Sequence, residues 1–283
     1  MGLFCHMNKK FKFGDHALDL NDPCVMGILN VTPDSFSDGG RFDTFDTAIE
    51  HAKRMVAAGA SIIDVGGEST RPGADEVSVN QELERVIPVV KALAAEISVP
   101  ISVDTSKPEV MLAAAGAGAS LINDVRALRV PGSLEAAAET GLPVCLMHMQ
   151  GEPESMQAKP KYADVVTEVM AFLHGRIEAA LKSGIAREAL LIDPGFGFGK
   201  SVAHNYQLLR ELPSFKTLEC PLLVGLSRKS MINAIVSRPA EERVAASVSL
   251  AVLAAERGAN IIRVHDVAET CDGLAMLGAL KGA

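Results

Sequence analysis

The apolar residues of the chain gather in eight short runs rich in Val, Ile and Leu. The runs lie at residues 25–31, 61–67, 100–106, 120–125, 143–149, 189–195, 221–227 and 260–266. Short, nearly continuous apolar runs are typical of parallel strands that are buried on both faces of a sheet. We therefore predict eight strands at these positions.

The longer stretches between the runs have the periodicity of helices. Residues 47–59 and 163–184 each end in a glycine, which commonly caps a helix C-terminus, and residues 80–97 have the same helical pattern. Eight strand-and-helix units without a linker predict an α/β fold, a single (β/α)8 TIM barrel over residues 25–283. A doubly wound open sheet is the alternative, and the lack of a dinucleotide-binding loop after the first strand counts against it.

Residues 1–24 precede the first predicted strand, and we treat them as an N-terminal extension. Its stretch "FKFGDHALDL" can form a short hairpin that closes the bottom of the barrel. No chemistry is evident in the extension.

Length and composition agree with one globular unit. The chain has 283 residues, of which 48% are hydrophobic, and a barrel of this type typically has roughly 250 residues. The net charge is -8 and basic residues form no run longer than "NKK", so we expect neither nucleic acid nor a membrane surface as a partner.

Cysteine usage and hydropathy favour the cytoplasm. The five cysteines are widely spaced and never form C-x-x-C, which argues against a disulfide framework and against a zinc site. No window has the length and apolar character of a signal peptide or a membrane span. We expect a cytoplasmic protein.

Polar residues follow the apolar part of every predicted strand. They are Asn30, Asp64, Asp104, Asn123, His148, Asp193, Ser227 with Lys229, and Arg263 with His265. In a barrel these ends meet at one mouth, where barrel enzymes have their active sites. One polar residue at a strand end is often only a loop cap, but agreement among all eight ends favours a site.

The residue types divide this mouth into two halves. Carboxylates and an amide follow the second, third, fourth and sixth strands, and they suit the N–H-rich edge of a heterocycle. Lys229, Arg263 and His265 follow the last two strands, where barrels commonly bind phosphate. Arg263 and His265 are two residues apart on a strand and therefore share a face, so we expect them to bind one anion together. A histidine bonded only to loop backbone is the alternative for His265, and we assign that role to His148.

The stretch "DPGFGFGKS" at residues 193–201 looks like a phosphate-binding loop but fits neither common template. The phosphate loop of nucleotide hydrolases requires glycine at the position of Pro194, and the dinucleotide fingerprint requires it at Lys200. The glycines instead indicate a tight turn with a close backbone approach, and we expect a helix to begin at Lys200 and Ser201.

Two connections after early strands are long and contain glycine. They are "NVTPDSFSDGGRF" from Asn30 and "GGESTRPGADEVS" from Gly66. Loops of this length in a compact domain are usually functional or disordered. Flexible connectors would explain their glycines, but not Phe36 or Arg71.

Eight stretches together resemble the dihydropteroate synthases. They are "GILNVTPDSFSDGG", "IIDVGGESTRPGA", "ISVDTSKPEV", "LINDV", "LMHMQG", "DPGFGFGK", "GLSRKS" and "IIRVHDV", in this order between Val25 and Val267. The resemblance implies a (β/α)8 transferase of folate biosynthesis. Such an enzyme joins 6-hydroxymethyl-7,8-dihydropterin diphosphate to 4-aminobenzoate and releases pyrophosphate.

The resemblance also implies a role for each matching residue. The pterin would contact Asp64, Asp104, Asn123, Met147, Asp193, Phe198, Gly225 and Lys229. The diphosphate would contact Asn30, Thr70, Arg71, Arg263 and His265, with Asn30 also binding Mg2+. The aminobenzoate would contact Phe36, Asp38, Thr70, Arg71, Pro72, Ser227, Lys229 and Ser230. Catalysis would rest on Lys229, Arg263, His265 and Asp104.

Further expectations follow from the same family. Sulfonamides, which mimic aminobenzoate, would be inhibitors. The family forms homodimers through its late helices, and residues 243–259 are apolar nearly all round, although a helix buried under its neighbours would show the same pattern.

Two other functions remain open at this stage. A pterin-binding methyltransferase barrel would use similar acidic residues but needs no diphosphate site, so Arg263 and His265 speak against it. A non-catalytic pterin-binding paralogue would not need Phe36, Pro72 and Ser230.

Overall fold

The computed structural model describes residues 10–32, 41–69, 77–151, 156 and 160–283. Within them, eight parallel strands form one sheet in the order β8-β7-β6-β5-β4-β3-β10-β9. The strands are β3 (Cys24–Asn30), β4 (Ile62–Gly66), β5 (Ile101–Asp104), β6 (Leu121–Asp124), β7 (Val144–Met147), β8 (Leu190–Asp193), β9 (Leu223–Val224) and β10 (Ile261–Val264). A parallel bridge between Ile192 and Leu222 joins the two edges of the sheet. The barrel is confirmed, and the open sheet is excluded.

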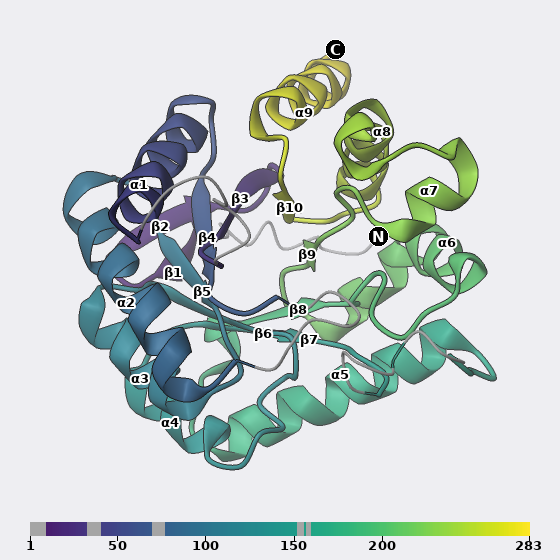
Figure 1. Cartoon of the computed structure of the whole chain (residues 1–283). Coiled ribbons are helices and arrows are strands. Elements are labelled where there is room, and N and C mark those ends of the chain that lie inside the picture. The colour runs from purple at the N-terminus through teal and green to yellow at the C-terminus, as the bar shows by residue number, and fades with distance from the viewer. Residues whose placement is uncertain (1–9, 33–40, 70–76, 152–155, 157–159) are drawn as a thin grey trace.

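Helices surround the barrel in the part of the chain that the structure describes (Figure 1). They are α1 (Arg41–Ala57), α2 (Val79–Glu96), α3 (Pro108–Ala117), α4 (Ser133–Thr140), α5 (Val165–Lys182), α6 (Val202–Arg210), α7 (Ser230–Val236), α8 (Val244–Glu256) and α9 (Val267–Gly282). The described residues also contain the short 3-10 helices η2 (Arg187–Ala189), η3 (Leu212–Leu218) and η4 (Ala240–Glu242). Gly59 and Gly184 follow the ends of α1 and α5, as the sequence predicts for helix caps.

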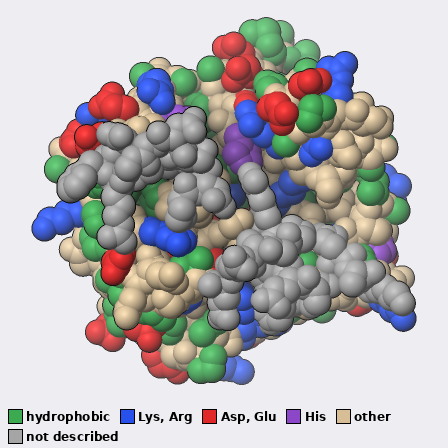
Figure 2. Space-filling model, in the orientation of Figure 1, with side chains coloured by type: hydrophobic (Ala, Val, Ile, Leu, Met, Phe, Trp, Pro, Cys, Tyr) green, Lys and Arg blue, Asp and Glu red, His purple; other side chains and the backbone are tan. Residues whose placement is uncertain are grey.

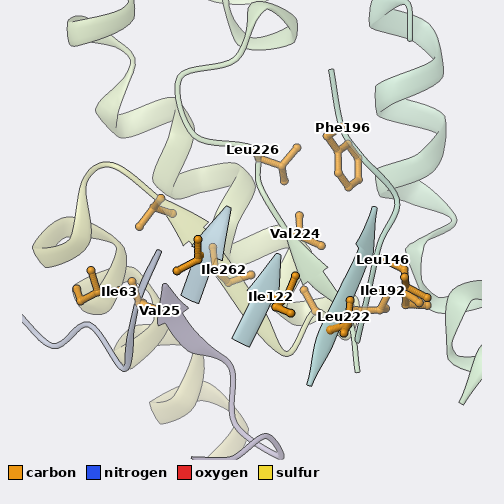
Figure 3. Close-up of a cluster of buried hydrophobic side chains, with 14 of the residues drawn as sticks. Val25, Ile63, Ile122, Leu146, Ile192, Phe196, Leu222, Val224, Leu226 and Ile262 are labelled. Atoms are coloured by element: carbon orange, nitrogen blue, oxygen red, sulfur yellow. The ribbon is translucent and has the colours of Figure 1, made fainter. Parts of the chain in front are cut away.

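The strands alternate between two environments because successive side chains point to opposite faces of a sheet. Outward residues such as Val25, Ile63 and Ile192 pack under the helices in the main apolar core (Figure 3). Inward residues near the strand starts form a second apolar cluster, the barrel floor, of Met26, Ile62, Leu121, Cys145, Leu191, Leu223 and Ile261.

This alternation places the polar residues one layer above the floor. Two residues after Ile62 comes Asp64, and in the same way Asp193 follows Leu191. Each of these carboxylates therefore faces the inside of the barrel at its mouth end. The apolar floor keeps water away from them on the lower side.

A two-stranded hairpin covers the floor from below. Strands β1 (Lys10–Phe13) and β2 (His16–Asp19) pair antiparallel, with Lys10 opposite Asp19. Phe11, Phe13 and Leu20 are buried against the inward residues of the barrel floor. The hairpin therefore closes the bottom of the barrel, while the division of the chain at residue 24 stays a prediction.

Candidate active site

Arg263 lies at the centre of a polar cluster in the barrel mouth. Its Nε donates to Oδ2 of Asp64 at 2.5 Å, and its Nη2 donates to Oδ2 of Asp104 at 2.9 Å. The amide of Asn123 donates to the same Oδ2 of Asp64 at 3.2 Å. Arg263 therefore lies on the carboxylates, and the predicted separation of the mouth into an acidic and a basic half is wrong for this residue.

Burial dominates the electrostatics of this cluster. The side chain of Asp64 is 0% exposed, and its Oδ1 has no hydrogen-bond partner among the described residues. Burial raises the pKa of Asp104 to about 7, with the Asp64 charge adding to the rise and Arg263 opposing it. Burial would lower the pKa of Arg263, but the two carboxylates raise it by more. The guanidinium therefore stays charged, and this one cation forms ion pairs with two carboxylates.

Asp193 and Lys229 are two further charged groups of the mouth, and each influences the pKa of the other. Asp193 is buried, its Oδ1 accepts a hydrogen bond from the Gly195 amide at 2.7 Å, and burial raises its pKa against the opposing charge of Lys229. Burial lowers the pKa of Lys229 to about 8, although Asp193 favours its charged form. The Lys229 amino group donates to the carbonyl of Phe196 and lies 4.7 Å from the centre of the Phe198 ring.

An apolar wall adjoins these charged groups. Met147 is buried in a small cluster with Val125, Met149 and Met156, and Phe198 packs against it. On the other side, a Cβ atom placed on Gly225 would lie 3.9 Å from Lys229 Nζ and from Arg263 Cβ. Gly225 thus faces the same region as the two cations. An apolar wall beside hydrogen-bonding groups is the arrangement that binds a flat heterocycle.

Ser227 and His265 lie together at the rim. The Ser227 hydroxyl is 3.0 Å from Nδ1 of His265 and accepts a hydrogen bond from the His265 backbone amide at 3.2 Å. Ser230 is exposed and begins α7. The loop after β9 is therefore tied to the end of β10 beside Lys229.

Arg228, between Ser227 and Lys229, is a residue that the sequence analysis missed. Its φ of 58° is rare for a residue with a side chain. The Arg228 Nε donates to Asp266 Oδ2 at 3.0 Å, and its backbone amide donates to the Ser247 hydroxyl at 3.0 Å. These contacts from the β10–α9 junction and α8 fix the turn that presents Lys229.

Asn30 ends β3 at the mouth. Its Oδ1 lies 3.7 Å from a Cβ atom placed on Gly66, and that Cβ would lie 3.6 Å from the Cβ of Asp104. The side-chain amide of Asn30 makes no hydrogen bond to another described residue. Among the described residues, no group of three or more His, Cys, Asp or Glu side chains could hold a metal ion.

Five of the predicted site residues lie outside the described residues. They are Phe36, Asp38, Thr70, Arg71 and Pro72. Near one of these gaps, the amino group of Lys107 binds Glu68 at 2.6 Å and the fully buried Glu82 at 2.5 Å. Sequence reasoning missed Lys107, although its place three residues after Asp104 put it at the mouth.

The glycine-rich stretch does not expose its lysine. Lys200 is 3% exposed, and the Ser201 side chain caps α6 by accepting from the His204 amide at 3.2 Å. The helix therefore begins where the sequence predicts, but Lys200 points into the protein. His148 is also buried, and its Nδ1 lies 2.8 Å from the Lys200 Nζ.

Comparison with known proteins identifies the family. The pattern of the pterin-binding enzymes matches residues 26–265. The dihydropteroate synthase of Escherichia coli strain K12 is 58% identical over 267 residues, which cover 94% of this chain and 95% of that protein. The chain belongs to the dihydropteroate synthase family. The resemblance seen in the motifs is confirmed, and so is the enzyme class, a transferase.

Solved structures agree with this membership. The Yersinia pestis dihydropteroate synthase in complex with a sulfonamide drug has a TM-score of 0.91 and 57% identity, over 95% of this chain and 98% of that one. The Xanthomonas albilineans dihydropteroate synthase in complex with 7,8-dihydropteroate has a TM-score of 0.87 and 46% identity, over 97% of this chain and 100% of that one. No helix in the described ranges has the length and apolar character to span a membrane.

Proposed function

We propose that this chain joins 6-hydroxymethyl-7,8-dihydropterin diphosphate to 4-aminobenzoate, forming 7,8-dihydropteroate and pyrophosphate. One observation supports this above the others. Buried carboxylates and cations meet at a single barrel mouth beside an apolar wall, at the positions where the family motifs fall.

The pterin lies against the buried carboxylates in this proposal. Asp193 accepts hydrogen bonds from the N–H edge of the pyrimidine ring, and Asp104 and Asn123 bind the opposite edge. Lys229 donates to a ring acceptor. Support comes from the buried Oδ1 of Asp64, which lacks a partner among the described residues and lies beside Asn123. Met147, Phe198 and Gly225 line the faces of the ring.

The reaction makes its largest demand on the leaving group. The neutral aromatic amine attacks the methylene carbon, the C–O bond to the diphosphate breaks, and the amine loses its proton after the C–N bond forms. Arg263 and His265, with Thr70 and Arg71, stabilise the charge that develops on pyrophosphate, which is the kind of electrostatic contribution that dominates such sites.

Mg2+ is part of the proposal as the metal at Asn30. Magnesium prefers oxygen ligands and usually binds through few protein groups together with substrate phosphates. The amide oxygen of Asn30 fits this requirement because it lies at the mouth and makes no hydrogen bond to another described residue. When bound, the ion would neutralise phosphate charge. Chelation of Mg2+ should abolish turnover, and its return should restore it, while affinity for the pterin alcohol stays unchanged.

The aminobenzoate binds at the rim, beside Lys229, Ser227 and Ser230. We assign the remaining contacts to Phe36, Asp38, Thr70, Arg71 and Pro72, which lie outside the described residues. Sulfonamides occupy the same place. Support comes from the sulfonamide complex of the Yersinia pestis relative.

A cytoplasmic homodimer completes the proposal. Apolar side chains are exposed on α7, α8 and α9, with Ile235 at 65%, Leu253 at 39%, Met276 at 69% and Leu280 at 73%. Figure 2 shows hydrophobic side chains over the C-terminal end of α9. Exposed apolar side chains in one region are typical of an interface. Sedimentation should give a dimer that Met276→Asp weakens, whereas a monomeric wild type would contradict this assignment.

The decisive experiment is a coupled assay on the purified chain. Pyrophosphate release and the mass of dihydropteroate are measured with both substrates, and again with each one alone. Equal amounts of the two products confirm the function. Pterin binding without product indicates a non-catalytic paralogue, and methyl transfer from a methylated pterin indicates the methyltransferase alternative.

A further inference from the structure

Lys200 places its amino group inside the protein, between the loop after β8 and the segment after β7. The Nζ donates to the carbonyl of Gly195 at 2.8 Å and to that of Phe198 at 3.0 Å, and it lies 2.8 Å from Nδ1 of His148. A lysine is rarely buried without such partners, because an unsatisfied buried amine is costly. A fourth, longer contact joins the Nζ to the His148 carbonyl at 3.4 Å. These contacts take up the hydrogen-bonding capacity of the amino group, so Lys200 holds together the chain around it.

The loop between β8 and α6 is folded tightly around this amino group. A Cβ atom on Gly195 would lie 1.8 Å from the carbonyl oxygen of His148, and one on Gly199 would lie 2.4 Å from that of Gln150. The loop thus rests directly on the segment that follows β7. The Lys200 amino group binds two carbonyls of this loop, and the backbone of His148 and Gln150 packs against its glycines.

The same loop makes both contacts that support Lys229. Its Phe196 carbonyl accepts from the Lys229 amino group, and its Phe198 ring lies 4.7 Å below that group. One of the carbonyls bound by Lys200 belongs to Phe198 itself. A shift of the loop would therefore move the support of Lys229 directly.

We propose that Lys200, with His148 as its partner, is a positioning residue that sets where Lys229 stands against the pterin. The proposal rests on the pterin site of the proposed function. It also explains why the glycine-rich stretch ends in a lysine without binding a phosphate. His148 is suited to the role because burial, together with Lys200, lowers its pKa to about 2 and keeps the imidazole neutral.

The first test is Lys200→Met, which keeps an unbranched side chain as far as Cε and removes the amino group. Calorimetric titration with the pterin alcohol should show about tenfold weaker affinity or more, with a stoichiometry near one, because small displacements of binding groups are costly. A merely structural role would lower the thermal midpoint or the binding-competent fraction and leave Kd unchanged, and that result would overturn the proposal.

A double-mutant cycle tests the route through Lys229. If Lys200 acts through Lys229, then Lys229→Met and the double variant Lys200→Met/Lys229→Met should bind the pterin alcohol equally well, because residues that act through each other are not additive. Losses that add would show that Lys200 acts elsewhere.

A second pair of variants decides the matter if Lys200→Met does not fold. In His148→Asn, the amide oxygen offers an acceptor close to the position of Nδ1, whereas His148→Phe offers none. Pterin affinity should stay near the wild-type value in the first and fall in the second. Equal affinity in both would contradict the proposal.

These binding measurements separate this inference from the proposed function. A wild type that binds the pterin alcohol but forms no dihydropteroate would overturn the function, while the comparison of Kd values would still decide the role of Lys200. A wild type that turns over, with unchanged pterin affinity in folded Lys200→Met, would overturn only the present inference.

Discussion

The guanidinium of Arg263 on β10 reaches across the barrel mouth to Asp64 on β4, with Nε 2.5 Å from Oδ2. The Asp64 side chain has no solvent exposure, so this contact is its main compensation for burial. Arg263 therefore has two tasks, the balance of buried acids and the binding of the diphosphate that we propose.

Arg263→Met should lower both stability and diphosphate binding. Loss of one partner leaves a buried charge, which costs about 3–5 kcal/mol in the free energy of unfolding. Urea unfolding measures this cost, and the double variant Asp64→Asn/Arg263→Met should recover most of it. A single variant as stable as the wild type would show that Arg263 does not compensate the burial of Asp64.

Deprotonation of Lys229 should weaken the affinity for the pterin alcohol at alkaline pH. Burial lowers the pKa of Lys229 to about 8, so the amino group loses its proton, and with it a hydrogen-bond donor, as the pH rises through this value. Affinity for the pterin alcohol should fall above pH 8 in the wild type and be independent of pH there in Lys229→Met. Turnover of that variant should fall about 100-fold, as expected for loss of one donor at a reacting centre. Near-normal turnover would remove Lys229 from the site.

Protonation of Asp104 should weaken the affinity for the pterin alcohol at acid pH. Burial raises its pKa to about 7, and only the ionised carboxylate accepts hydrogen bonds at both oxygens. Pterin affinity should therefore increase as the pH rises through about 7. The measurement is the same titration over a pH series. In Asp104→Asn this pH dependence should vanish, and its persistence would assign it to another group.

Gly225 and Gly195 should respond differently to alanine. A Cβ atom on Gly225 would meet its nearest neighbour at 3.9 Å, so Gly225→Ala should change the free energy of unfolding by less than about 0.5 kcal/mol. Its methyl group would nevertheless face Lys229 and raise KM for the pterin. Gly195→Ala would place Cβ 1.8 Å from a carbonyl oxygen, and it should cost about 2 kcal/mol or more. Comparable unfolding curves for the two variants would contradict the geometry.

Sulfonamides should compete with aminobenzoate, and only after the pterin diphosphate, or pyrophosphate with Mg2+, has bound. The residues that we expect to frame the drug are Phe36, Pro72 and Ser227, and substitutions there should discriminate drug from substrate by about 10- to 200-fold. Titration of a sulfonamide with and without pterin and pyrophosphate checks the order. Tight binding to the empty enzyme would contradict ordered binding, and no binding under either condition would remove these residues from the pocket.

The sequence was sufficient for the barrel because its signal is periodic. Strands buried on both faces leave apolar runs, and their polar ends lie at one mouth whatever the details of packing. Asp64, Asp104, Asn123 and Asp193 could be placed together on this basis alone.

The pairing of these side chains could not be predicted in the same way. Which residues meet across a barrel depends on the stagger of its strands, for example the register that sets Gly66 opposite Asp104. Arg263 has a side chain long enough to reach several partners, and only the three-dimensional arrangement selects Asp64. Lys200 and His148 are 52 residues apart, and no local pattern connects them.

The hairpin beneath the barrel also bears on where small molecules enter and leave the site. Among the described residues, Phe11 and Phe13 cover the lower end of the barrel and are buried against its apolar floor. We therefore expect every ligand to enter and leave at the barrel mouth, whether it is the pterin, aminobenzoate, pyrophosphate or the product. We expect the molecule that binds deepest to bind first, an order that would follow from a hairpin at the opposite end of the barrel from the mouth.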